Sequence, residues 1–137
     1  MREIKFRAKR ADTGAWVCGD LTHAAKINTK EQADESGKRR QPVLRVANYD
    51  VDETTIGQYT GLMDGNYREI YEGDVLEFTD PWEGYRHLKT VVFNKGAFCF
   101  KHAESKELTP MKSHQWWKYT VAGNIYDNPE LIKQQEK

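Results

Sequence analysis

Apolar and polar residues alternate along short stretches of the chain, with the period of two that is typical of β-strands. Between residues 3 and 9, apolar side chains alternate with charged ones, which predicts a half-buried strand. The turn sequence Asp-Thr-Gly at residues 12–14 separates this stretch from a second apolar one at residues 16–18. The two stretches and the turn between them predict a β-hairpin.

The rest of the chain repeats short apolar stretches between turn residues. The long polar stretch at residues 22–41 indicates a solvated loop or a marginal helix, and the polar stretch at residues 103–114 indicates a loop. The sequence Asn128-Pro129-Glu130 predicts a helix start, because Asn caps a helix, Pro fits its first position and Glu suits its positive end. Further strands are expected at residues 43–47, 54–59, 70–71, 75–78, 88–93, 97–100 and 116–121.

Many short strands separated by Gly and Asn turns favour a mainly β protein. Small all-β chains avoid open sheet edges by curling into a barrel, so we expect a barrel with a short C-terminal helix. Residues 1–48 are expected to form an N-terminal β-hairpin part that includes the polar loop 22–41. Residues 49–137 are expected to form the barrel part, and the two parts together one unit.

Composition narrows the class of protein further. The chain has 137 residues, of which 12% are aromatic, and two cysteines; so few cysteines favour a reduced protein of the cytoplasm. The N-terminal sequence MREIKFRAKR lacks the apolar region of a secretory signal. The apolar runs are too short to span a membrane. We therefore expect a folded domain with an aromatic-rich core and no membrane association.

The net charge is zero, but the charges are strongly segregated along the chain. Residues 1–48 have a net charge of +5, residues 49–85 of −9 and residues 86–137 of +4. One interpretation is that folding places acidic and basic segments side by side. The other is a dipolar surface that steers a charged partner or a second copy of the chain.

Three segments carry a resemblance to a known family. The sequences Ile56-Gly57-Gln58-Tyr59-Thr60-Gly61-Leu62-Met63-Asp64 and Glu69-Ile70-Tyr71-Glu72-Gly73-Asp74-Val75 form the central motif, and residues 2–8 and 123–131 agree with it. These segments resemble the YopX family of phage and prophage proteins. The resemblance implies an SH3-like barrel and a phage or prophage origin, and it supplies no catalytic or binding residue. The glycines of the motif suit bends and close backbone contacts, although part of the motif could instead form a binding site.

Catalytic and metal-binding patterns are weak throughout. The acidic cluster around Asp50 lacks the Gly and Glu spacing of a calcium loop. Cys99 and His102 have metal-ligand spacing, but they would point to opposite faces of a strand, and a structural zinc ion needs four ligands. No serine lies in a nucleophile elbow, and no phosphate-binding or dinucleotide-binding loop is present. The sequence therefore predicts no catalytic residue, metal or cofactor.

Aromatic residues beside basic ones are the best candidates for binding. Two adjacent tryptophans on a strand face opposite ways, so we expect one of Trp116 and Trp117 in the core and the other exposed. Such residues suit a protein-binding or self-assembling module with a host, phage or identical partner. The alternative is nucleic-acid binding by base stacking on a basic barrel surface. The candidate binding residues are Trp82, Tyr85, Trp116, Trp117 and Lys118.

Overall fold

The structure is a computed structural model that describes residues 3–24, 43–103, 105–111 and 118–135. The chain divides into two compact units. The N-terminal unit is Ile4–Ile56, and the C-terminal unit is Gly57–Lys137 together with Met1–Glu3. The division into parts at residue 48 stays a prediction.

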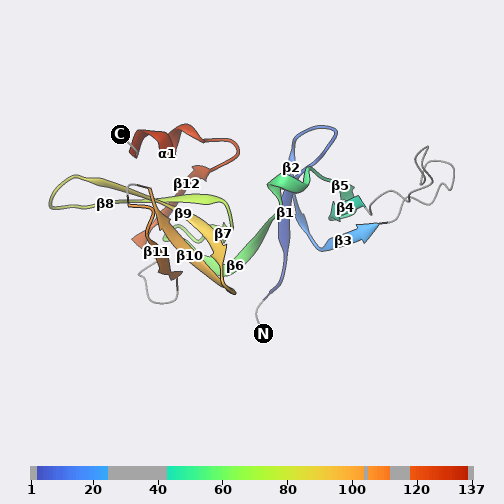
Figure 1. Cartoon of the computed structure of the whole chain (residues 1–137), viewed down its shortest axis with the longest axis horizontal. Helices are drawn as coiled ribbons and strands as arrows, with labels where there is room; N and C mark the ends of the chain where they lie inside the picture. The colour runs from blue at the N-terminus through green and yellow to red at the C-terminus, as the bar shows by residue number, and fades with distance from the viewer. Residues whose placement is uncertain (1–2, 25–42, 104, 112–117, 136–137) are drawn as a thin grey trace. The chain divides into compact units, whose positions relative to one another are not determined.

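The described residues are mostly antiparallel β-strand, as the alternating pattern predicts (Figure 1). No helix among them is long and apolar enough to cross a bilayer. The elements of the N-terminal unit are β1 (Phe6–Lys9), β2 (Trp16–Gly19), β3 (Leu21–Ala24), β4 (Val43–Val46), β5 (Tyr49–Asp50) and the 3-10 helix η1 (Glu53–Thr55). The elements of the C-terminal unit are β6 (Gly57–Met63), β7 (Glu69–Tyr71), β8 (Asp74–Thr79), β9 (Arg86–Asn94), β10 (Ala97–His102), β11 (Leu108–Pro110), β12 (Thr120–Asn124) and α1 (Glu130–Gln135).

In the N-terminal unit, β1 and β2 form the predicted hairpin, with Arg7 opposite Cys18. Strands β3, β4 and β5 form a second antiparallel sheet. Ala8, Val46 and Val51 make the buried core of this unit. β3 extends into residues 22–24, so the prediction of a loop is wrong for these residues, and residues 25–41 lie outside the described part of the chain.

The strand predicted for residues 54–59 begins later than expected. Residues Glu53–Thr55 form a 3-10 turn, because the side chain of Asp52 accepts hydrogen bonds from the backbone N–H and the hydroxyl of Thr54. Local bonds of this kind compete with strand pairing. The strand itself, β6, starts at Gly57.

The C-terminal unit is built on a five-stranded sheet with the order β11-β10-β9-β8-β12. Four of these strands follow one another as hairpins, and β12 pairs with the outer edge of β8. The short strand β11 lies within residues 103–114, so the prediction of a loop is wrong for Leu108–Pro110. Of the strand predicted at residues 116–121, the part that the structure describes as strand begins with β12 at Thr120. Trp116 and the rest of residues 112–117 lie outside the described residues. The buried residues of the main core are Ile70, Leu76, Val91, Phe100, Met111 and Tyr119.

The short helix α1 begins where the sequence predicts. Leu131 and Ile132 of α1 pack against a second cluster of buried residues, Val75, Leu88 and Ala103. The mainly β fold class is therefore confirmed, with a short helix at the C-terminal end. The closure of the sheet into an SH3-like barrel stays a prediction.

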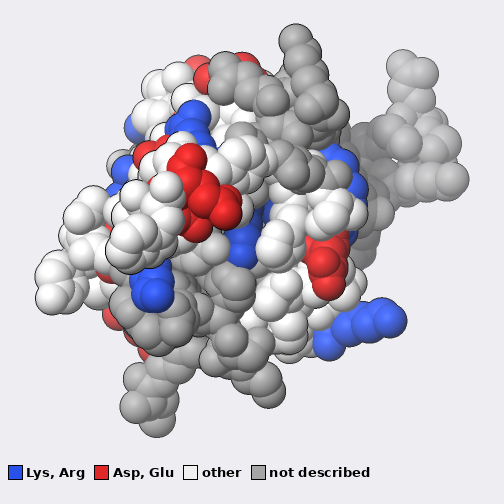
Figure 2. Space-filling view, turned by 90° about the vertical axis from the view of Figure 1, so that its left-hand side faces the viewer, with Lys and Arg blue, Asp and Glu red and all other residues white. Residues whose placement is uncertain are grey.

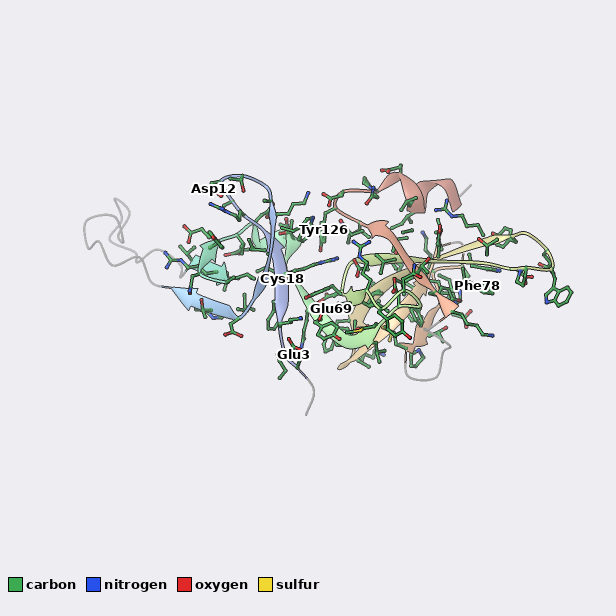
Figure 3. All side chains as sticks on the ribbon, turned by 180° about the vertical axis from the view of Figure 1, so that it is seen from behind. Glu3, Asp12, Cys18, Glu69, Phe78 and Tyr126 are labelled. Carbon is green, nitrogen blue, oxygen red and sulfur yellow. The ribbon has the colours of Figure 1, made fainter. Side chains whose placement is uncertain are left out.

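Two glycines of the central motif have a structural role. Gly73 has a φ of +93°, and a Cβ there would lie 3.1 Å from the ring of Tyr126, whose side chain is labelled in Figure 3. A Cβ on Gly57 would lie 2.5 Å from the carbonyl oxygen of Glu72. Both positions need a residue without a side chain.

Candidate binding surface of the C-terminal unit

The loop between β8 and β9 is a turn fixed by hydrogen bonds. The N–H of Asp80 donates to the carbonyl of Tyr85 at 2.9 Å, and the N–H of Gly84 donates to the carbonyl of Asp80 at 2.8 Å. The Asp80 carboxylate accepts hydrogen bonds from the N–H groups of Trp82 and Glu83, at 2.7 and 3.1 Å. These two bonds lower the pKa of Asp80. The loop thus has a defined shape.

Trp82 lies at the tip of this turn with 92% of its surface exposed. Tyr85, the residue before β9, is exposed near the same end of the hairpin. Figure 1 shows the β8–β9 hairpin extending away from the rest of the sheet. Two of the five residues that the sequence predicts for binding, Trp82 and Tyr85, therefore lie on one projecting hairpin.

An ion pair joins the two strands of the hairpin below the tip. Nε and Nη2 of Arg86 lie 2.6 and 2.5 Å from Oε2 of Glu77. Arg86 belongs to the basic segment 86–137 and Glu77 to the acidic segment 49–85, and Arg45 of the first basic segment likewise pairs with Asp50. These two pairs favour the interpretation in which folding places segments of opposite charge together.

One face of the sheet next to the hairpin carries alternating residues of β9. The rings of Tyr85 and His87 meet edge to face with centroids 4.7 Å apart, and His87 stacks on Phe78 of β8 at 6.1 Å. Figure 3 labels Phe78 among the side chains of this sheet. Lys89 follows on the same face, because side chains two positions apart on a strand point the same way.

Lys89 is only 5% exposed, which is rare for a lysine. Its ammonium nitrogen lies 5.0 Å from the ring centroid of Tyr119 and 5.6 Å from that of Phe100, within the range of a cation–π contact. Burial lowers the pKa of Lys89 to about 8 and raises the pKa of Tyr119. The lysine is therefore a poorly hydrated cation held against two aromatic rings.

His102, the last residue of β10, lies opposite Lys89 in the strand register. Its Nε2 lies 3.1 Å from the hydroxyl of Thr109. Burial lowers the pKa of His102, and the positive charges of Lys89 and His87 add to that effect, while Glu107 opposes it. A small pocket of about 100 Å³ opens here, lined by Tyr85, His87, Leu88, Lys89, His102, Ala103 and Ser105.

The other predicted binding residues lie elsewhere or are not described. Lys118 is exposed, just before β12 begins its pairing with β8 at Glu77. Trp116 and Trp117 lie outside the described residues. The prediction that one of these tryptophans is buried and the other exposed therefore stays a prediction.

Cys99 and His102 lie on opposite faces of β10, as the sequence predicts. Cys99 pairs with Val92 and is buried, whereas His102 pairs with Lys89 beside the pocket. The two side chains therefore cannot hold one metal ion together. Within the described ranges, no group of three or more His, Cys, Asp or Glu side chains could hold a metal ion.

His87, Lys89 and His102 are not among the binding residues predicted from the sequence, and the pocket they line was not predicted. The available signal was the spacing of Tyr85, His87 and Lys89, which puts them on one face of a strand. The contribution of His102 depends on the pairing of β9 with β10. That register is a long-range property that spacing along the chain does not reveal.

Comparisons with known proteins agree with this fold. The family model described as YopX protein matches residues 5–133. The crystal structure of protein EF1440 from Enterococcus faecalis is similar, with a TM-score of 0.58 and 23% sequence identity over 96% of this chain and 99% of that chain. At this level of identity the similarity concerns the fold. No curated protein matches the chain.

Proposed function

The chain belongs to the YopX family, and on that premise we propose that it is a non-enzymatic protein-binding module whose β8–β9 hairpin contacts a partner protein. The observation that carries this proposal is Trp82, 92% exposed on a turn fixed by hydrogen bonds. Tryptophan, tyrosine and arginine dominate the binding energy of protein interfaces. A turn that is already ordered loses little entropy when it binds.

The charged residues near Trp82 indicate which kind of partner surface would fit the hairpin. Asp80 and Glu83 lie within two positions of Trp82 in the sequence, and Arg86, four positions after it, forms an ion pair with Glu77. Figure 2 is seen from the side on which the hairpin projects in Figure 1, and both carboxylate and cationic groups lie at this surface. The partner surface is an apolar pocket with a rim of mixed charge, because rim charges guide encounter and orientation.

The partner is a phage or bacterial host protein met in the cytoplasm of the host cell, or a second copy of the chain. The resemblance to phage and prophage proteins supports that setting, and so does the presence of only two cysteines, both free. A self-associating protein would bury Trp82 of each copy at the contact. Light scattering of the purified protein separates the two kinds of partner.

Trp82→Ala tests the proposal, and Tyr67→Ala is its matched control. Tyr67 is an aromatic residue that is 86% exposed at the β6–β7 turn. Tagged wild-type protein and both variants are used to capture partners from infected host cells, and the molar mass of each is measured by light scattering. We expect the Trp82 variant to lose a partner or an oligomeric state that the Tyr67 variant keeps. Equal partners and equal mass in all three proteins would contradict the proposal.

Nucleic-acid binding is the second candidate function. It is favoured by the sequence of Tyr85, His87 and Lys89 along one face, since aromatic and basic residues together bind single strands. The zero net charge of the chain counts against it. A gel shift with single-stranded and double-stranded DNA and RNA at low salt distinguishes it from protein binding.

A further inference from the structure

Three basic side chains from two neighbouring strands line the pocket at the end of β10. His87 and Lys89 alternate on β9, and His102 lies opposite Lys89 on β10. The turn after β10 brings Ser105 to the same pocket, and the hairpin brings Tyr85. The pocket thus combines an ammonium group, two imidazoles and two hydroxyl groups.

We propose that this pocket binds a phosphate group, which accepts hydrogen bonds from Lys89, His87 and His102. The described residues that line it include no carboxylate. Its volume of about 100 Å³ is several times the roughly 10–15 Å³ that a cavity needs, by this kind of measure, to hold one water. A tetrahedral oxyanion therefore fits together with some of its water.

The burial of Lys89 makes the pocket a stronger anion site than three surface cations would be. A hydrogen bond to a charged group strengthens where water is excluded. The rings of Phe100 and Tyr119 hold the ammonium group in place, so little side-chain entropy is lost when an anion arrives. The anion in turn supplies the negative charge that favours the protonated lysine.

Anion binding at this pocket is coupled to proton uptake. Among the described residues, the charged groups that act on His102 are Lys89 and His87 on β9 and Glu107 before β11. His87 also acts on Asp80, and the ring of Tyr119 packs on Lys89. Burial and the neighbouring cations lower the pKa of His102 and so disfavour its protonated form, whereas a bound anion favours that form. Affinity for an anion of constant charge should therefore rise as the pH falls from 8 to 6.

The experiment uses the imidazole NMR signals of the full chain during titration with inorganic phosphate at constant ionic strength. We expect the signals of His87 and His102 to shift with a common dissociation constant, while that of His23, in the N-terminal unit, stays unchanged. A sulfate titration at pH 6 and pH 8 tests the proton coupling, because sulfate keeps its charge over this range. Shifts of His87 and His102 no larger than that of His23 would overturn the proposal.

Two variants and a matched control identify the residues. Lys89→Met keeps an unbranched apolar stem against the rings and removes the charge, whereas Lys101→Met removes the same charge from an exposed position on the other face of β10. We expect phosphate binding to weaken at least about tenfold in the first and to stay unchanged in the second. If Lys89→Met does not fold, His102→Gln takes its place, because an amide can still bond Thr109 while the proton coupling is lost. Equal affinity for phosphate in the pocket variant and in Lys101→Met would contradict the proposal.

Two further probes test the identity and the source of the phosphate group. Binding of methyl phosphate as tightly as inorganic phosphate indicates a phosphate monoester whose organic part lies outside the pocket, and weaker binding indicates the free ion. Acetate that binds as well as phosphate would contradict the assignment to phosphate. Trp82→Ala should retain phosphate binding, so this proposal and the proposed function can fail separately.

Discussion

The carboxylate of Asp64 accepts a hydrogen bond at 2.9 Å from the N–H of Val121, which lies 57 positions later in the chain. The other oxygen of the same buried carboxylate accepts bonds from the N–H groups of Asn66 and Arg68 in the β6–β7 turn. One side chain of the family motif thus fixes a turn and joins it to β12. This supports the interpretation of the motif as architecture.

Replacing Asp64 by Asn should destabilise the protein by about 1–3 kcal/mol, the cost of leaving a buried donor without an acceptor. An amide keeps one oxygen for the turn but presents N–H groups to the N–H of Val121. Urea unfolding of the two proteins measures the difference.

The matched control for this change is Asp80→Asn. Asp80 uses only Oδ1 to accept its bonds from Trp82 and Glu83, so an amide can keep both of them. Its unfolding free energy should stay within about 0.5 kcal/mol of the wild type, as is usual for surface changes. Equal losses in the two variants would show that the bond to Val121 is unimportant.

Replacing Gly73 by Ala should cost more stability than replacing Gly96 by Ala. Both glycines have positive φ, +93° and +83°, but a Cβ on Gly96 meets nothing within 4 Å, whereas one on Gly73 meets the Tyr126 ring. The Gly96 variant is expected to lose about 1–2 kcal/mol from backbone strain alone. A comparison of the urea midpoints of the two variants measures the effect of the contact with Tyr126. A smaller loss of stability in the Gly73 variant than in the Gly96 variant would contradict the structural role of Gly73.

The pKa of Lys89 predicts how stability changes in mildly alkaline solution. The folded pKa is about 8 because of burial, below the ordinary value of 10.5, so the unfolded chain binds more protons between these two values. Stability from this group therefore rises as the pH increases from 8 towards 10.5. Between pH 7 and 9.5 the gain should be on the order of 1–2 kcal/mol, since one pKa unit is worth about 1.4 kcal/mol.

Lys89→Met provides the comparison for this measurement, because the two proteins share every titratable group except Lys89. We expect the wild type to gain stability relative to the variant across this pH range, and the variant to be the more stable protein at pH 7. Parallel pH profiles of the two urea midpoints would show that Lys89 remains well hydrated in the folded protein.

Trp82→Ala should leave the unfolding free energy within about 0.5 kcal/mol of the wild type, because the side chain is 92% exposed. A thermal or urea unfolding curve checks this. A loss of several kcal/mol would mean that the indole packs within the folded chain, and the loss of a partner in that variant would then have a structural explanation.

The alternation of apolar and polar side chains predicted most of the strands, because a half-buried strand shows this pattern within its own few residues. The prediction failed where local polar hydrogen bonds or long-range strand pairing decide the structure. The side chain of Asp52 turns Glu53–Thr55 into a 3-10 helix, and β11 forms in a polar stretch because β10 offers it an edge. The pocket was not predicted because it depends on long-range pairing: His102 lies opposite Lys89 only through the register of β9 and β10.

The five-stranded sheet has two blunted edges. β11 is three residues long and includes Pro110, which has no N–H to offer an incoming strand, and β12 carries a bulge between Val121 and Gly123 at the opposite edge. Edges of this kind resist extension by a foreign β-strand, and so discourage fibril growth. If the proposed function is right, we expect a partner protein to contact side chains of the hairpins rather than to extend this five-stranded sheet.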